Sequence, residues 1–528
     1  MARPITRRNL RFTESSVKTD QPGLAVEPRT LWSPPQGVDY LNRHNRIDAQ
    51  HTFDMLNMYL DRGVSRSRHG TDQIGIEADD PVMGVVNFVT GSGIGFLVRF
   101  TTTHLQLWDG TTWNDVPGAT FTGETTDFFT YTAWNDTLLF SNNKDGLMEY
   151  KPLIGALEVI AGGPNAKHLT TFADRVVAGA ADGLEYRTRW TVAKNSHDWE
   201  GTGSGFEDLL STPGGQVDQV MGTFPVSDTT ALMVRTGSIY QVTRTGDPDA
   251  PFRFEILYAN LGSLSRHSID VIPGGIIFFG LDDVYILTGT EIQAIGQLVK
   301  DRQADEATDL KLIRGVFRPK LKEYWLSLGA DRLYRYSFQD KGWTPHRYPF
   351  NIRWFDETIF HFSGLTWDQA VGTWDGQTET WDDLLGEANA AAFYFVTDEA
   401  QGNVIAEDEN LVADAYIQDT HAAFGIDIQS GVVLAASPLE KTEVIETQLE
   451  YESVGGQTLI FEYSANGGST WISYSSKTIA TTTVAQIVRC MKTLSRKTLM
   501  FRIRSTILGQ LTLISYTPFL IVEAKIAP

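Results

Sequence analysis

A short pattern that recurs through the first two thirds of the chain constrains the fold most strongly. In each copy an apolar run meets a tight turn, and an aliphatic residue closely followed by an aromatic residue comes next. The six copies end at Trp108, Tyr150, Tyr186, Tyr240, Tyr285 and Tyr334. Successive aromatic residues are therefore 42, 36, 54, 45 and 49 positions apart. Units of about 40 to 50 residues with strand–turn–strand chemistry are typical of a β-propeller.

Two of these units align residue by residue. Residues 134–139 match residues 172–177, and both stretches are followed by Asp-Gly-Leu, at residues 145–147 and 182–184. An Asp-Gly pair between apolar runs predicts a hairpin, because a type I′ turn needs positive φ at both central residues. We therefore expect residues 81–411 to form a propeller of six or seven blades.

The N-terminal 80 residues have a different character. They contain five prolines and little periodicity before a turn rich in Arg and Gly, from Arg62 to Gly70. We expect residues 1–80 to form an extended arm that leads into the first blade, with one helical turn near Ala49–Leu60. A disordered tail is the alternative for this segment.

The C-terminal part, residues 412–528, has long alternating segments. Leu459 and Phe461 alternate with polar neighbours, and so do Phe501 and Ile503. A period of two with polar partners is typical of a half-buried antiparallel sheet, and five or six such strands predict a β-sandwich. The five carboxylates within residues 398–410 suggest a solvated connection before it. The expected fold class is therefore all-β: an arm, a propeller and an antiparallel sandwich.

Composition excludes several classes of protein. The chain of 528 residues is 42% hydrophobic and 21% charged, as expected of a folded protein with more than one domain. Its net charge of −21 gives no general attraction for nucleic acid phosphates. We see no signal peptide and no apolar run long enough to span a membrane. The lone cysteine, Cys490, excludes an intrachain disulfide and is consistent with folding in a reducing cytoplasm.

No catalytic, cofactor-binding or metal-binding residues are predicted. The ten histidines are scattered, and neither an H-E-x-x-H motif, a Walker loop nor a G-x-S-x-G elbow is present. One stretch, Ser464–Trp471, resembles the Asp-box of sialidases, with Asn466 where Asp is usual. That motif stabilises a hairpin turn, so we expect a non-enzyme that requires no cofactor.

The layout as a whole resembles the tail nozzle, or tail tubular, proteins of short-tailed bacteriophages. The resemblance rests on the Arg/Gly turn from Arg62 to Gly70 and on the blade phrases Leu107–Gly110 and Phe338–Trp343. It also rests on the sandwich phrase that runs from Phe461 to Trp471. It covers most of the chain but includes no signature motif.

This resemblance implies a structural virion protein that is assembled in the host cytoplasm and located in the phage tail. Such proteins form a homohexameric ring below the head-to-tail adaptor and portal complex, and the genome is ejected through it. Further expected partners are tail fibres or other tail proteins, and genomic DNA that passes without specific binding. A strongly acidic chain suits a conduit, because each Lys or Arg contact with phosphate would slow the passage of DNA.

Two other functions remain open from the sequence. The Thr-Trp-Asp triplets at Trp367, Trp374 and Trp381 could line a carbohydrate-binding or glycan-degrading groove, with Asp368, Asp375 and Asp382 beside them. Buried packing is the competing interpretation of these tryptophans. An intracellular scaffold of the WD-repeat kind is less consistent with the sequence, because the Trp-Asp pairs do not close each unit.

Overall fold

The computed structural model describes residues 25–28, 36–43, 45–48, 50–91, 94–118, 120–210, 218–307, 309–359, 391–408, 413–415, 421–432, 442–496, 499–507 and 510–522. Within these ranges the chain consists mainly of strands, accompanied by a short helix, α1 (Lys300–Glu306), and a 3-10 turn, η1 (Arg266–Ser268). The expected all-β class is therefore confirmed.

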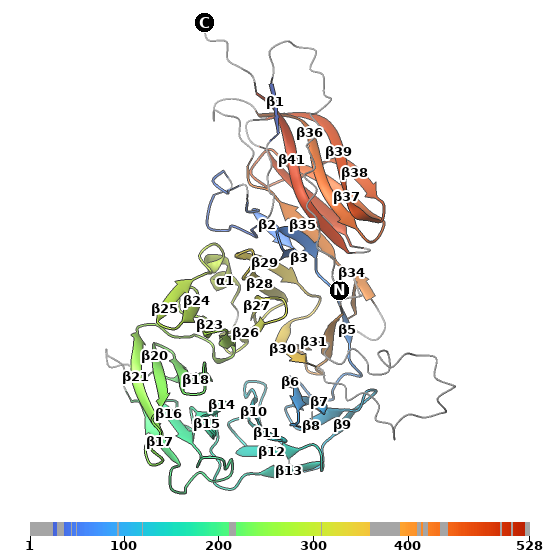
Figure 1. Ribbon diagram of the computed structural model, residues 1–528. Coiled ribbons are helices and arrows are strands. Elements are labelled where there is room, and N and C mark those ends of the chain that lie inside the picture. Colours follow the sequence, from blue (N-terminus) through green and yellow to red (C-terminus); the bar gives the residue numbers. More distant parts are fainter. Residues whose placement is uncertain are drawn as a thin grey trace.

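Six consecutive antiparallel sheets of four strands form most of a ring, which fills the lower part of Figure 1. Ring sheets 1 to 3 are β6 (Val82–Val89), β7 (Gly95–Thr101), β8 (Leu105–Trp108), β9 (Trp113–Asp115); β10 (Thr130–Trp134), β11 (Thr137–Ser141), β12 (Leu147–Lys151), β13 (Ala156–Val159); and β14 (His168–Phe172), β15 (Arg175–Gly179), β16 (Arg187–Trp190), β17 (Gly205–Asp208). Ring sheets 4 to 6 are β18 (Val220–Pro225), β19 (Thr230–Arg235), β20 (Ser238–Arg244), β21 (Phe252–Ala259); β22 (Asp270–Ile272), β23 (Gly275–Phe279), β24 (Val284–Thr288), β25 (Glu291–Ala294); and β26 (Ile313–Arg318), β27 (Glu323–Leu328), β28 (Arg332–Ser337), β29 (Gly342–Arg347).

Ring sheet 7 combines the end of the ring with a strand from the N-terminal region. It contains β30 (Ile352–Ile359), β31 (Ala391–Thr397), β32 (Val404–Asp408), β5 (Gly70–Gln73), β33 (Ala413–Ala415) and β34 (His421–Ala423), in that order. β5 pairs antiparallel with β32, and Thr71 lies opposite Glu407. The N-terminal region thus supplies the fourth strand of the last sheet, which ties the two ends of the ring together.

Neighbouring sheets contact each other around the whole ring. From ring sheet 2 to ring sheet 7 and back to ring sheet 1, the first strand of each sheet contacts the first strand of the next. Ring sheets 1 and 2 share an apolar cluster in which the ring centroids of Phe100 and Phe140 are 5.1 Å apart. The first strands therefore line the ring axis, and the fourth strands form its outer edge.

The aromatic residues of the recurring pattern occupy the same place in successive sheets. Trp108, Tyr150, Tyr240, Tyr285 and Tyr334 lie on third strands, and Tyr186 immediately precedes the third strand of ring sheet 3. The pattern thus marks one structural unit per sheet.

The two Asp-Gly turns differ in geometry. Asp182 and Gly183 both have positive φ, at 57° and 75°, as a type I′ turn requires. The prediction is wrong for the other turn, where Gly146 but not Asp145 has positive φ. The carboxylate of Asp145 instead accepts a hydrogen bond from the backbone N–H of Thr122, at 2.9 Å.

Two further antiparallel sheets pack together beyond the ring, at the top of Figure 1. One contains β3 (Met58–Asp61), β4 (Val64–Ser67), β41 (Leu511–Val522), β36 (Thr442–Ser453) and β39 (Thr482–Arg496), with β1 (Ala25–Pro28) also paired to β41. The other contains β2 (Asp54–Leu56), β35 (Gly425–Gln429), β40 (Met500–Thr506), β37 (Gln457–Ser464) and β38 (Ile472–Ile479). We call this pair the C-terminal sheets. The predicted alternation is confirmed, since Leu459, Phe461, Phe501 and Ile503 are buried between them.

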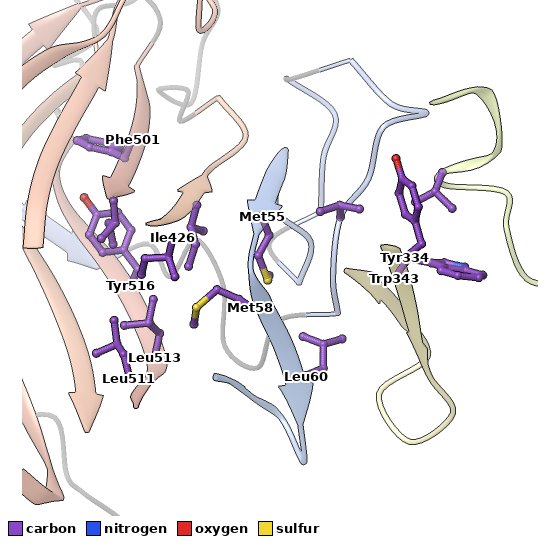
Figure 2. Close-up of a cluster of buried hydrophobic side chains, with 14 of the residues drawn as sticks. Met55, Met58, Leu60, Tyr334, Trp343, Ile426, Phe501, Leu511, Leu513 and Tyr516 are labelled. Carbon is purple, nitrogen blue, oxygen red and sulfur yellow. The ribbon is translucent and has the colours of Figure 1, made fainter. Parts of the chain in front are cut away.

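A short N-terminal segment joins the C-terminal sheets to the ring. Figure 2 shows Met55, Met58 and Leu60 between Tyr516 of β41 on one side and Trp343 of β29 on the other. All five side chains are buried in one continuous apolar cluster. The helical turn expected near Ala49–Leu60 is wrong, because β2 and β3 occupy this stretch and gain more by completing two sheets.

Buried polar groups reinforce the same junction. Asn57, which has a φ of 60°, donates from Nδ2 to the carbonyl of Gly425 and accepts at Oδ1 from the backbone N–H of Arg347, both at 2.8 Å. The guanidinium of Arg68 lies 4.4 Å from the ring centroid of Tyr348 and 4.0 Å from that of Phe424. These contacts link the N-terminal segment, the ring and the C-terminal sheets. Because the linking side chains are buried among all three parts, we expect the three parts to fold cooperatively.

The acidic segment at residues 398–410 is not the solvated connection that its carboxylates suggested. β32 lies within it, and Glu407 is buried beside Arg318 and Arg335. The charge pattern led to a wrong expectation because a carboxylate can be buried in the fold where arginines from another sheet pair with it.

Candidate functional site: an exposed edge of the C-terminal sheets

β38 and β39 form one edge of the C-terminal sheets. Each is the last strand of its own sheet, and the two strands contact each other. They lie together on the outer side of these sheets in Figure 1. β39 is 15 residues long and pairs only with β36 among the described strands. A long edge strand presents a row of backbone groups to which another strand can pair.

Four large apolar side chains are exposed on this edge. Val484, Ile487 and Met491 of β39 are 66%, 50% and 74% exposed, and Ile472 of β38 is also exposed. Cys490, on the opposite face of β39, is buried. We call β38 and β39 together the C-terminal rim. Exposed apolar side chains on an open edge strand make the rim a candidate interaction surface.

The C-terminal rim also carries positive charge, although the chain has a net charge of −21. Lys477, Arg489 and Lys492 are exposed on it. The Nε of Arg489 lies 3.6 Å from a carboxylate oxygen of Glu446, which leaves much of its guanidinium accessible. A basic and apolar strip on an acidic protein favours an acidic partner.

The outer edge of the ring has the opposite charge. The fourth strands of ring sheets 1 to 5 each carry an exposed carboxylate, from Asp115, Glu158, Glu207, Glu255 and Glu291. Exposed apolar side chains accompany three of them: Val159, Phe206 and Ile256. In ring sheet 6 the fourth strand, β29, is covered by β2 and β3 instead. Charged side chains are a common means of preventing unwanted pairing at open strand edges.

A cavity of about 770 Å³ separates the ring from part of the C-terminal sheets. Most of the charged groups that line it have a partner of opposite charge. Arg502 donates from Nε to Asp427 at 2.8 Å, and Arg504 donates from Nε to Glu462 at 2.9 Å. The second of these hydrogen bonds raises the pKa of Arg504. The cavity therefore lies at a boundary between the ring and the C-terminal sheets, and ion pairs stabilise that boundary.

The sequence candidates for sugar recognition are only partly visible. Trp367, Trp374 and Trp381, with their neighbouring aspartates, lie outside the described residues. The Ser464–Trp471 stretch is the turn between β37 and β38, in which Asn466 Oδ1 accepts from the backbone N–H of Thr470 at 2.9 Å. Asn466 therefore stabilises a hairpin, as expected.

The described ranges hold neither a metal-binding cluster nor a membrane-spanning helix. There, no group of three His, Cys, Asp or Glu side chains is arranged to hold a metal ion. No helix in that part of the chain is long and apolar enough to cross a bilayer. The C-terminal rim could not be predicted from the sequence, because period-two alternation marks a half-buried strand without showing whether the strand lies at an edge.

No protein-family model matches the chain, and no curated protein matches it. Many solved structures do match. One is the crystal structure of BamB from Moraxella catarrhalis, with 11% sequence identity and a TM-score of 0.35. That match covers 67% of this chain and 96% of the BamB chain. The function is therefore inferred from this chain's own residues.

Proposed function

We propose that this chain is a structural subunit of a ring-shaped homo-oligomer that serves as the tail nozzle of a short-tailed bacteriophage. In this proposal the ring is a seven-bladed β-propeller and the C-terminal sheets are a β-sandwich. The subunits surround a channel below the head-to-tail adaptor and portal complex, and the genome leaves through that channel. The proposal assigns no catalytic step to the chain.

The observation that carries the proposal is the C-terminal rim. Each large apolar side chain that becomes fully buried contributes about 1.5–3 kcal/mol. Val484, Ile487 and Met491 together therefore offer a substantial gain to a partner that covers them. Pairing at the open edge of β39 would add backbone hydrogen bonds, and assembly would protect that edge from aggregation.

Charge favours a head-to-tail contact between copies. Two outer ring edges repel each other, because both present exposed carboxylates such as Glu207 and Glu291. The rim of one copy, with Arg489 and Lys492, suits the outer ring edge of the next copy. A contact between two different surfaces can repeat from copy to copy. It closes into a ring when the rotation that relates neighbouring copies is a whole fraction of a turn. The number six comes from the resemblance to nozzle proteins.

The net charge suits a channel for DNA. A chain with a charge of −21 has little tendency to collect phosphates by releasing counterions. We expect purified protein to leave double-stranded DNA unretarded in a gel-shift assay at about 150 mM salt. Tight DNA binding under these conditions would contradict the role as a conduit.

Electron microscopy tests the proposal as a whole. The full-length protein should form rings with a central opening, either alone or on its head-to-tail adaptor, and should occupy the tail of the virion. Antibody labelling of virions provides the second arm. A protein that stays monomeric in the presence of the adaptor, or that is absent from purified virions, would refute the proposal.

A further inference from the structure

Two adjoining cavities lie at the axis of the ring. Their volumes are about 410 and 280 Å³, and both are lined by Lys167, Arg266 and His267. The smaller one is lined by the first strands of ring sheets 2 to 7, including Tyr131 of β10 and Trp354 of β30. We call the larger one the axial mouth. Concave sites of this size are typical of small-molecule binding.

The axial mouth is positively charged in an acidic protein. Lys144, Lys167, Arg266 and Lys311 line it, together with the single carboxylate of Asp127. Asp127 lies 3.8 Å from Lys144 Nζ. A second carboxylate, that of Glu185, pairs with Lys167 behind the lining. Four cations and one carboxylate therefore line the mouth, while Glu185 and Asp145 interact with Lys167 and Lys144 from outside the lining. The excess of positive charge focuses the field toward an anion.

Arg266 is the best placed donor of the group. Its side chain is 13% exposed, and its Nη2 is 3.9 Å from Glu185, which is too far for a good hydrogen bond. Its Nη1 is buried and has no hydrogen-bond partner among the described residues. Burial lowers the pKa of Arg266 to about 10, so the guanidinium remains charged at neutral pH. A buried charged donor without a partner is costly, and a bound anion would offset that cost.

The acids deeper in the axis are already engaged. Asp356 accepts from Arg314 Nη2 at 3.0 Å and from the hydroxyl of Tyr131 at 2.5 Å. Asp270 accepts from the backbone N–H of Phe317 at 2.6 Å, and burial raises its pKa to about 7. Neither carboxylate is therefore a strong competitor for the cations of the axial mouth.

Three aromatic rings in contact with each other line the two cavities: Phe128 lines the larger, Trp354 the smaller and His267 both. The ring centroid of His267 lies 5.4 Å from that of Phe128 and 5.1 Å from that of Trp354. Burial keeps the pKa of His267 well below its ordinary value, so this imidazole is neutral at pH 7. Apolar walls exclude water, which strengthens the attraction between an anion and Arg266.

We propose that the axial mouth binds an oxyanion, a carboxylate or a phosphate carried by a small ligand, with Arg266 as the central donor. A planar guanidinium matches both groups through two parallel hydrogen bonds, and the lysines add point charges around it. This site is independent of the C-terminal rim, so it goes beyond the nozzle assignment and can stand without it.

Calorimetric titration of the full-length protein with inorganic phosphate and with citrate tests the proposal. At low ionic strength we expect saturable binding of at least one of these probes. Arg266→Gln should weaken that binding at least tenfold. Arg253→Gln removes an arginine that is 69% exposed on β21, the outermost strand of ring sheet 4, and lines neither cavity, so it should leave the affinity unchanged.

A second variant covers the case in which Arg266→Gln does not fold. The double substitution Lys144→Gln and Lys311→Gln changes only exposed side chains at the mouth and should weaken binding at least threefold. Preference for phosphate or for citrate identifies which class of oxyanion the site takes. Absence of saturable binding of both probes up to about 10 mM, or equal affinity in wild type and the mouth variants, would overturn the proposal.

Discussion

Arg318 and Glu407 form a buried ion pair between ring sheets 6 and 7, with Nη1 2.6 Å from Oε2 and each side chain 5% exposed. Arg318 also lies 3.1 Å from a carboxylate oxygen of Glu357. Its guanidinium stacks 4.3 Å from the ring centroid of Trp325, and that of Arg335 lies 4.1 Å from the same centroid. This network ties the sheet completed by β5 to the rest of the ring.

Arg318→Met should destabilise the protein strongly. The substitution leaves Glu357 and Glu407 buried without their main cation, and breaking a buried pair in this way typically costs about 3–5 kcal/mol. The two carboxyl groups would then hold their protons to higher pH in the folded state than in the unfolded chain. The free energy of unfolding of the variant should therefore fall as pH rises from about 5 to 8. Urea denaturation at several pH values measures this.

A matched control is the exposed pair of Arg253 and Glu255, whose side chains are 69% and 52% exposed. Arg253→Met should cost less than about 1 kcal/mol, since surface ion pairs contribute little. Equal losses in the two variants would contradict the role of the buried network.

Met58→Ala should weaken the ring and the C-terminal sheets together. Met58 is completely buried in the cluster that joins them, and removing such a side chain typically costs about 2–5 kcal/mol. Unfolding should remain a single transition at a lower midpoint. Hydrogen exchange should show reduced protection in both parts of the molecule. Two separate transitions, or a loss confined to one part, would contradict a shared core.

His346 should make the protein sensitive to mild acid. It is completely buried, and burial together with Arg335 and Arg68 lowers its pKa well below the ordinary value. The unfolded chain therefore gains a proton below about pH 6.5 that the folded state does not. Stability should fall by up to about 1.4 kcal/mol per pH unit below that point. His346→Gln should reduce this slope in denaturation curves between pH 7 and 5; an unchanged slope would contradict the assignment.

The thiol of Cys490 should react slowly in the folded protein. Burial of Cys490 in the apolar cluster between the C-terminal sheets raises its pKa, and the thiolate is the reactive form. We expect the rate of reaction with a disulfide reagent at pH 8 to be at least about tenfold lower than in urea-unfolded chain. Similar rates in the two states would show that the edge at β39 opens readily.

The repeated sheets could be predicted from the sequence because each unit is local. The hairpin turn and the aromatic residue that follows, as at Asp182–Gly183 and Tyr186, lie within a few residues of each other, so spacing alone reveals them. The alternation of Leu459 and Phe461 with polar neighbours revealed a half-buried sheet for the same reason.

The closure of the ring could not be predicted. β5 pairs with β32, which lies more than 300 residues further along the chain. A strand of four residues, such as β5, has no sequence pattern that identifies so distant a partner. The same holds for β2 and β3, where burial of Met55 and Met58 depends on the docking of two other sheets. Glu407 looked solvated because its partners, Arg318 and Arg335, come from a different sheet.

The C-terminal rim depends on which strand ends a sheet, and only pairing in three dimensions decides that. Ile487 and Met491 look like ordinary members of an alternating strand in the sequence. Their exposure of 50% and 74% sets them apart once β39 is seen as an edge.

The most direct test of assembly through the C-terminal rim is to measure the mass of the oligomer. Analytical ultracentrifugation of the full-length protein, with its adaptor if required, should show a closed oligomer, and Ile487→Glu with Met491→Glu should shift it to monomer while circular dichroism stays unchanged. The control Leu281→Glu replaces a more exposed apolar side chain, which lies on the ring away from the rim, and should leave the oligomer intact. An oligomer of unchanged mass in the double variant would contradict assembly through the C-terminal rim.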